Sequence, residues 1–316
     1  YPTISKQSSA GGVQSIQLPR TGLLQGIRLN ISGTLTSGGG ISAPNAKGKA
    51  SIIRRVRVFA NSSNDIFSVS GAGYSYLLTE MLGHETVMTP GLLGVNNGRD
   101  AVATGAFRLD MYIPIAMNVE NSIGLFMLQN NQTTVELQIE FAPDSEVATG
   151  IDSLTCTVQP RGHVFKIPDD NTLPMLGLSY VHQIVEDSRG MVVGDYDYEP
   201  TKGDIYLQIA HALTIAQANN NEDFNRFRQI IQQSDVWMDE VPDSLDTLNA
   251  LQRGRARLKG NCIIDFMGSS GFGDFSIERD WYDTQWATDF VHRFTVTDSP
   301  STLTTIRRQL IRQAGS

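Results

Sequence analysis

Apolar residues recur at every second position along much of this chain, and this alternation most constrains its fold. It is clear in segments 13–19 (VQSIQLP), 24–36 (LQGIRLNISGTLT) and 133–141 (TTVELQIEF). Successive side chains of a β-strand point to opposite faces of a sheet, so a period of two predicts strands with one buried face. Turn residues such as Gly, Pro, Ser and Asn separate the runs. The pattern predicts an all-β chain with many short strands.

Two segments instead have the spacing of helices, one in each half of the chain. In 73–84 (GYSYLLTEMLGH), apolar side chains recur at helical spacing and Gly83 follows where a helix would end. Segment 242–258 (PDSLDTLNALQRGRARL) begins with Asp243 or Ser244 as a candidate cap. Its expected stripe comprises Leu245, Leu248, Leu251, Arg255 and Leu258.

Segment 227–241 (FRQIIQQSDVWMDEV) is compatible with both types of element. Its apolar positions Phe227, Ile230 and Ile231 fit a helical period as well as a strand. We favour the strand interpretation.

The chain is long enough for two domains of ordinary size. Segment 168–174 (PDDNTLP) combines two prolines with Asp and Asn, which is typical of a linker. We therefore predict domains at 1–169 and 170–316. Each half contains early strands, one helix and further strands, so the architecture is duplicated, although residue identity between the halves is too low to establish a sequence repeat.

The charge of the chain disfavours nucleic acid as a partner. The net charge is −8 and the sequence pI is about 5.1, so a phosphate backbone would be repelled except by a segregated basic face. The basic groups are Arg54, Arg55 and Arg57; Arg253, Arg255, Arg257 and Lys259; and Arg307, Arg308 and Arg312. Aromatic residues do not interleave with them, so we expect solvated faces or ion pairs at subunit interfaces.

Cysteine, histidine and membrane signals are sparse. Cys156 and Cys262 are far apart, so we expect two small core residues and neither a disulfide framework nor a zinc site. No two of the five histidines lie within four residues of each other, which leaves no local nucleus for a metal site. The sequence has no apolar stretch of bilayer-spanning length, and segment 1–12 lacks the organisation of a signal peptide, so a soluble protein is expected.

Two polar segments could carry chemistry, but each has a simpler interpretation. Segment 268–275 (GSSGFGDF) is glycine-rich, yet no Gly-Lys-Ser/Thr and no helical pattern follow, so a turn is favoured over a phosphate-binding loop. Segment 195–199 (DYDYE) would place three carboxylates on one face if extended, as a calcium site could use. Pro200 argues against a calcium-binding loop, and a solvated loop or a subunit contact is favoured.

Segment 278–283 (ERDWYD) raises a different possibility. Paired carboxylates beside aromatic platforms are typical of sugar-processing clefts, and Asp280, Asp283, Trp281 and Trp286 would supply both. Glu278 adds a third carboxylate. Aromatic residues in such a run more often anchor the core, so the glycan site is the less favoured interpretation.

The order of elements resembles a known family. In segment 107–141, an apolar strand enters 112–124 (YIPIAMNVENSIG) and the chain returns through 133–141 (TTVELQIEF). Later come the helix at 244–258, the strand at 262–268 (CIIDFMG), segment 278–296 (ERDWYDTQWATDFVHRFTV) and the closing strand 301–311 (STLTTIRRQLI). This order is similar to that of double jelly-roll major capsid proteins of tailless icosahedral bacterial viruses, the tectivirus-like group.

The resemblance implies two consecutive eight-stranded antiparallel jelly rolls, each with a short helix. It further implies a homotrimeric, pseudo-hexagonal capsomer that assembles in the host cytoplasm into the icosahedral virion shell. The expected partners are the chain itself, neighbouring capsomers, minor capsid and vertex proteins and an internal virion membrane, with no sequence-specific nucleic acid. No enzymatic activity, catalytic residue, cofactor or metal is expected.

Three further expectations accompany this resemblance. Pro114 should mark an edge or bulge where strand pairing stops. The chain ends, 1–13 and 307–316, should become ordered on assembly. The alternative function is a secreted two-jelly-roll protein that binds or cleaves glycans; it predicts a monomer, whereas a capsid protein predicts a stable trimer.

Overall fold

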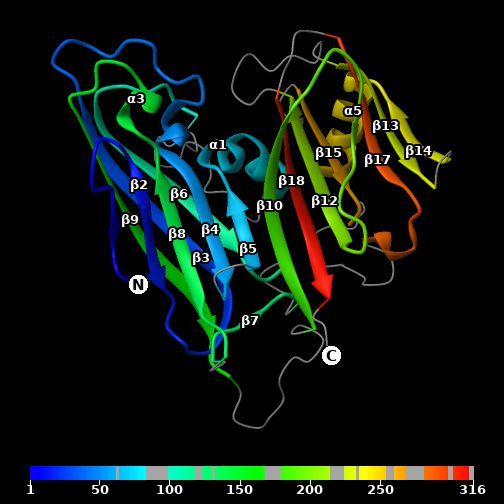
Figure 1. Ribbon diagram of the computed structural model, residues 1–316, viewed down its shortest axis with the longest axis horizontal. Helices are drawn as coiled ribbons and strands as arrows, with labels where there is room; N and C mark the ends of the chain where they lie inside the picture. The colour runs from blue at the N-terminus through cyan, green and yellow to red at the C-terminus, as the bar shows by residue number, and fades with distance from the viewer. Residues whose placement is uncertain are drawn as a thin grey trace. The chain divides into compact units, whose positions relative to one another are not determined.

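The computed structural model divides into two compact units (Figure 1), Tyr1–Val185 with Arg312–Ser316, and Glu186–Ile311. The described residues are 1–61, 64–82, 99–117, 123–129, 132–167, 179–213, 224–232, 235–253, 260–267, 281–297 and 302–312. The linker at 168–174, and with it the predicted domain boundary between residues 169 and 170, lies outside them.

The first unit is built from two groups of four strands. Its strands are β1 (Ile4–Ser5), β2 (Gly12–Gln17), β3 (Leu23–Thr36), β4 (Ile53–Ala60), β5 (Asn64–Val69), β6 (Gly105–Pro114), β7 (Phe126–Met127), β8 (Val135–Phe141) and β9 (Ser153–Phe165). One group has the order β1-β9-β3-β6, with the short β7 beside β3, and the other has the order β5-β4-β8-β2. Strict alternation is clearest in β8, where Val135, Leu137, Ile139 and Phe141 are buried.

Short helical segments complete the first unit. They are η1 (Gly48–Ile52), α1 (Gly71–Gly73), η2 (Tyr74–Leu78), α2 (Thr79–Leu82) and α3 (Asp144–Val147). The helix expected at 73–84 is confirmed over 71–82, and η2 forms a π-helical turn within it. Ser70 caps the start, since its hydroxyl accepts a hydrogen bond from the backbone N–H of Gly73 at 2.9 Å. Gly83 lies outside the described residues.

The second unit repeats this arrangement. Its elements are β10 (Tyr180–Gly190, which belongs to this unit from Glu186 on), β11 (Gly194–Tyr198), β12 (Ile205–Leu213), β13 (Phe224–Ile231), β14 (Asp235–Glu240), α5 (Pro242–Arg253), β15 (Asn261–Asp265), β16 (Tyr282–Asp283), η5 (Thr284–Trp286), β17 (Phe290–Val296) and β18 (Thr302–Arg312). The orders are β11-β17-β13-β14 and β15-β12-β18-β10, with β16 beside β12. The predicted eight principal strands per unit are therefore confirmed among the described residues.

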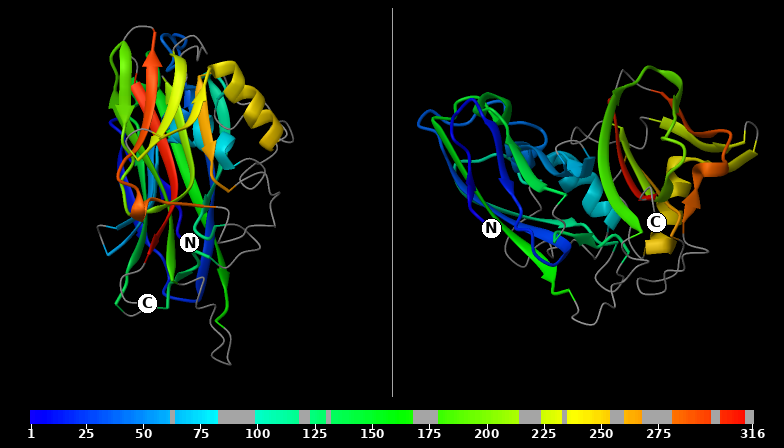
Figure 2. Two further views of the ribbon diagram at one scale, coloured as in Figure 1. Left: turned by 90° about the vertical axis from the view of Figure 1, so that its right-hand side faces the viewer. Right: turned by 60° about the horizontal axis from the view of Figure 1, so that its bottom comes forward.

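Aromatic side chains dominate the core of the second unit. Its buried members include Tyr198, Tyr206, Phe224, Phe227, Phe266, Phe290 and Phe294. Helix α5, yellow in Figure 2, contacts β13 and β15. Leu245 of this helix is fully buried in the same core, as the predicted stripe requires.

Three local features bear on the sequence predictions: segment 227–241, the start of α5 and Pro114. Segment 227–241 forms β13 and β14, so the strand interpretation is confirmed. The predicted cap of α5 is wrong: the helix begins at Pro242, a residue suited to the first helical position because it lacks an N–H, and Asp243 and Ser244 follow within the first turn. Pro114 is the last residue of β6, which is the outermost of the described strands in its sheet, so its predicted role at an edge is confirmed.

A close backbone approach fixes one glycine in the first unit. A Cβ on Gly33 of β3 would collide with the carbonyl oxygen of Thr155 and the ring of Phe107. Overpacking of this kind costs about 1–3 kcal/mol. We expect Gly33→Val to destabilise the first unit by about that amount and to speed the reaction of Cys156, its buried partner across β3 and β9, with a thiol reagent.

Labelling at Cys156 would be quantified by peptide mass spectrometry. The matched control is Gly39→Val, because a Cβ on Gly39 meets no atom within 4 Å. Equal labelling rates in the two variants would show that the contact at Gly33 is easily relieved.

Candidate interaction surface

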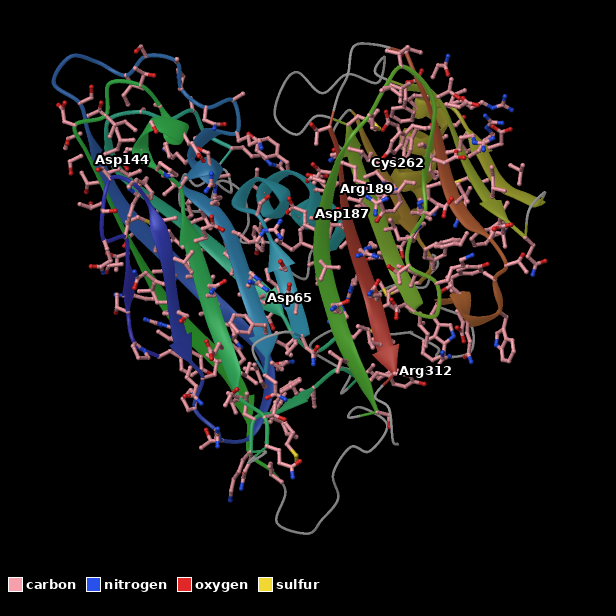
Figure 3. The ribbon with its side chains drawn as sticks, in the orientation of Figure 1. Asp65, Asp144, Asp187, Arg189, Cys262 and Arg312 are labelled. Atoms are coloured by element: carbon pink, nitrogen blue, oxygen red, sulfur yellow. The ribbon has the colours of Figure 1, made fainter. Side chains whose placement is uncertain are left out.

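Two basic residues of strand β4 form ion pairs within the first unit. On β4, Arg54 contacts Glu140 at 3.2 Å and Glu146 at 2.6 Å. Arg57 contacts Asp65 of β5 at 2.8 Å. Figure 3 labels Asp65 on this strand. These ion pairs are partly exposed and of modest strength, but they neutralise the positive charges of the two arginines. Arg54 and Arg57 therefore form ion pairs within one chain, and Arg55 donates a hydrogen bond to the hydroxyl of Ser68 at 3.2 Å.

The acidic segment 195–199 proves to be mostly strand and not a loop. Asp195 and Asp197 lie on the exposed face of β11, opposite β17. Asp197 binds Arg293 through both carboxylate oxygens, at 2.5 and 2.6 Å. Asp195 accepts a hydrogen bond from Thr295 at 2.7 Å and contacts Arg228 at 3.2 Å.

These residues belong to a larger charged ladder on one sheet. The ladder comprises Asp195 and Asp197 on β11, Asp239 on β14, and Arg293, Arg226 and Arg228 on the central strands β17 and β13, so arginines in the middle of the sheet pair with aspartates on its outer strands. The hydrogen bond from Thr295 is the main cause that lowers the pKa of Asp195, and the hydrogen bond from Arg226 likewise lowers the pKa of Asp239. The described residues contain no group of three or more His, Cys, Asp and Glu side chains that could hold a metal ion. Two of the three carboxylates considered for calcium in the sequence, Asp195 and Asp197, bind arginine instead.

The candidate glycan site is only partly described. Glu278 and Asp280 lie outside the described residues, as does segment 268–275. The carboxylate of Asp283 accepts a hydrogen bond from the backbone N–H of Gln285 at 3.0 Å and thereby caps η5. Trp286 is 79% exposed. The geometry therefore gives Asp283 a local structural role and leaves an exposed indole beside it.

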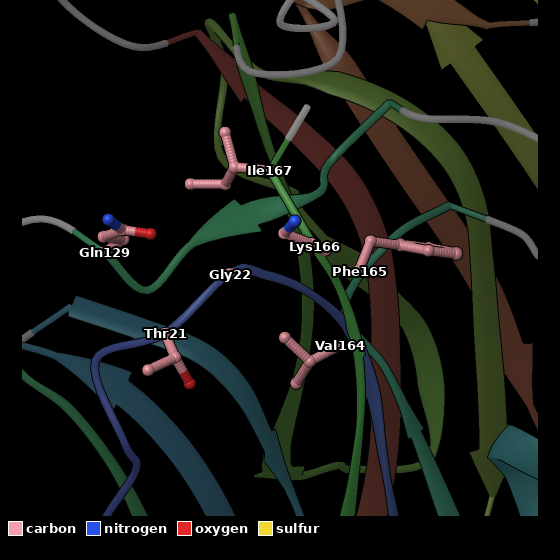
Figure 4. Close-up of a pocket in the computed structure, with 7 residues that line it drawn as sticks. All are labelled: Thr21, Gly22, Gln129, Val164, Phe165, Lys166 and Ile167. Carbon is pink, nitrogen blue, oxygen red and sulfur yellow. The ribbon is translucent and has the colours of Figure 1, made fainter. Parts of the chain in front are cut away.

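A pocket in the first unit has a volume of about 450 Å³ (Figure 4). Its lining residues are Thr21, Gly22, Gln129, Val164, Phe165, Lys166 and Ile167. Lys166 is the charged member of this lining, and Val164 and Phe165 are substantially exposed. The lining resembles a small amphipathic surface rather than a site with paired acid and base groups.

Exposed apolar side chains gather on the second unit. They are Val192, Val193, Val236, Trp237, Val241 and Trp286. Three of these, Val236, Trp237 and Val241, lie on β14 or directly after it, and we call them the β14 surface. β14 is the last strand in its sheet, so it also presents an unpaired edge among the described strands.

Trp237 is the member of the β14 surface that stacks on neighbouring aromatic rings. Its ring stacks on Phe266 at 5.9 Å with an interplanar angle of 7°, and on Tyr282 at 5.9 Å and 26°. Even so, 59% of the residue is exposed. Stacking on two rings restricts the side chain, so less conformational entropy is lost on binding, and tryptophan is enriched among the residues that dominate interfaces.

Sequence reasoning missed one contact because it searched for neighbours along the chain. His211 of β12 and His292 of β17 are separated by 81 positions, yet their rings are hydrogen-bonded at 2.8 Å and fully buried. Burial lowers the pKa of His292 to about 3 and the pKa of His211 well below its usual value, so both rings are neutral.

The sequence matches no protein-family model and no curated protein. Solved structures are similar along nearly the full chain. The major capsid protein of Sulfolobus turreted icosahedral virus has a TM-score of 0.72 at 15% identity, over 98% of this chain and 94% of that one. VP54 of PBCV-1 has a TM-score of 0.67 at 9% identity, over 99% of this chain and 94% of that one. The major capsid protein P2 of bacteriophage PM2 has a TM-score of 0.56 at 14% identity, over 100% of this chain and 99% of that one.

The chain has the double jelly-roll fold. Both predicted jelly rolls, their order and the all-β class are confirmed by these similarities together with the strand orders above. Within the described residues of this double jelly roll, no helix has the length and apolar character needed to cross a membrane.

Proposed function

We propose that the double jelly-roll chain is a major capsid protein whose three copies form a pseudo-hexagonal capsomer of an icosahedral virion shell. The observation that supports this most is coverage: the similarity to capsid proteins extends over 98–100% of this chain and 94–99% of the three compared chains. Two similar eight-stranded units per chain let three chains imitate six-fold packing. Neighbouring capsomers, minor capsid and vertex proteins and an internal membrane are the partners of this role, which is structural and not enzymatic.

The β14 surface is our candidate for the contact between copies of the chain. It combines an open strand edge with an exposed apolar group, and Trp237 is already held in place by Phe266 and Tyr282. The occupant we propose is a second copy, because a shell protein must bury such surface against itself. An interface of this kind buries well over about 1,000 Å² in a stable oligomer.

The native mass of the purified chain tests the proposed function. At low micromolar concentration, native mass spectrometry should show a species of three times the 34.7 kDa chain mass that persists on dilution. A clean monomer would contradict the capsomer. It would instead favour the glycan-binding alternative, which a glycan screen with Trp286→Ala would examine.

Trp237→Glu should weaken the trimer. Loss of a tryptophan that dominates an interface costs about 2 kcal/mol or more, so association should weaken by about 30-fold or more at each contact. The trimer should dissociate at micromolar concentration while circular dichroism remains that of the parent chain.

Two companion variants sharpen this test. Trp237→Phe keeps an aromatic ring on Phe266 and should retain the trimer. Trp286→Glu introduces the same charge at another exposed indole of the second unit and should also retain it. An equal loss in Trp286→Glu would show that the trimer responds to any added charge and not to the β14 surface.

A further inference from the structure

A layer of polar side chains crosses the aromatic core of the second unit. Tyr198, His292 and Gln229 are register partners on the adjacent strands β11, β17 and β13. From the other sheet, His211 and Thr305 are register partners on β12 and β18. All five are at most 1% exposed. We call these five residues the buried polar layer.

Hydrogen bonds in this layer join the two sheets. His211 Nε2 lies 2.8 Å from His292 Nδ1, and His211 Nδ1 lies 2.8 Å from Thr305 Oγ1. Aromatic rings surround the pair: the ring centroid of Phe294 is 5.1 Å from that of His211, and Phe290 is 5.0 Å from His292. The bonded chain therefore sits in an environment that water does not otherwise reach.

The chain of hydrogen bonds ends on atoms that have no partner. His292 Nε2 and both amide atoms of Gln229, Nε2 and Oε1, lack a hydrogen bond to any part of the chain that the structure describes. Folded proteins satisfy nearly all buried polar atoms, with ordered water where protein groups do not suffice. Three such atoms on two facing residues therefore point to a small polar molecule as their partner.

His292 Nε2 and the side-chain amide of Gln229 border the same small volume inside the core. Gln229 and His292 are directly opposite each other on antiparallel strands, and both side chains point inward. Directly opposite residues have Cβ atoms about 5 Å apart, so their polar ends border the same volume.

The chemistry of the site selects a neutral partner that can both donate and accept. If the Thr305 hydroxyl donates to His211 Nδ1, then His211 donates to His292 Nδ1, and His292 Nε2 carries a proton that needs an acceptor. If the chain runs the other way, the same atom needs a donor. The Gln229 amide offers one group of each kind. Both histidines are neutral, which gives no advantage to an anion.

We propose that the buried polar layer is an internal hydration site, in which ordered water binds His292 Nε2 and the Gln229 amide. The water completes the hydrogen-bond chain that begins at Thr305 and joins the sheets through His211 and His292. The second unit is thus held across its core by a polar bridge that includes solvent.

A crystal structure of the parent chain at neutral pH and high resolution tests this site. Density for water should lie about 2.7–3.2 Å from His292 Nε2 and from an amide atom of Gln229. A direct hydrogen bond between Gln229 and His292, with no water density, would overturn the hydration site.

A double-mutant cycle provides a second readout from the three tryptophans, all of which lie in the second unit. Gln229→Met should lower the folding equilibrium constant of this unit about tenfold, because the water and His292 lose partners. Combined with His292→Phe, the effect of Gln229→Met should largely vanish. Gln285→Met, at an exposed position, is the matched control and should have no effect. Independent effects of Gln229→Met and His292→Phe would also overturn the hydration site.

Discussion

Acidification from pH 7 to pH 4.5 should destabilise the second unit through its buried histidines. The folded-state pKa of His292 is about 3 and its unfolded value is about 6.5, so below pH 6.5 the unfolded state binds the proton more tightly. The contribution of the neutral His292 ring to the free energy of unfolding is fully present above pH 6.5 and is lost as the pH falls toward 3. His292 alone should account for about 3 kcal/mol at pH 4.5, and His211 acts in the same direction.

Denaturant titrations followed by tryptophan fluorescence would measure this loss, since the three indoles report on the second unit. His211→Leu/His292→Leu replaces both partners with apolar side chains of similar volume. Between pH 7 and 4.5, the free energy of unfolding should fall by about 3 kcal/mol or more in the parent chain beyond any fall in the double variant. His163→Leu, at an exposed position in the first unit, should follow the parent curve. Parallel curves for the parent and the double variant would contradict the role of the buried pair.

Phe294→Ala should also strongly destabilise the second unit. Phe294 is fully buried, and its ring centroid lies 5.1 Å from that of Phe227 and 5.8 Å from that of Phe224. Removal of a buried phenylalanine side chain costs about 3–5 kcal/mol, because apolar contact is lost and a cavity remains. The midpoint of denaturant unfolding, again followed by tryptophan fluorescence, should fall accordingly.

Phe165→Ala supplies the matched control for this substitution. Phe165 is 48% exposed, so the same truncation should change stability by about 0.5 kcal/mol or less. A comparable loss in both variants would mean that the core around Phe294 can collapse into the space that the ring vacates.

Much of this fold is predictable from the sequence because strand periodicity is a local signal. The alternation in 133–141 corresponds to β8, and the ambiguous segment 227–241 divides into β13 and β14. The predicted cap at Asp243 or Ser244 failed because Pro242 already fits the first helical position. A local pattern identified the element but not its first residue.

The functional features were less predictable because they depend on residues far apart in sequence. His211 meets His292 only when β12 and β17 face each other across the core. Asp195 and Asp197 suggested a cation site in the sequence, and only the pairing of β11 with β17 brings Arg293 against Asp197. Trp237 could not be distinguished from a core tryptophan, since its exposure follows from the position of β14 at the end of its sheet.

The charged ladder has a consequence for how two such chains could meet. Its three aspartates and three arginines cancel, so these six residues together add nothing to the net charge of −8. Two copies of the chain repel each other overall, but not where these faces approach. Two copies would therefore meet the least electrostatic repulsion where the charged ladder faces the other chain. Added salt should speed their association, because it screens the repulsion between the remaining negative charges.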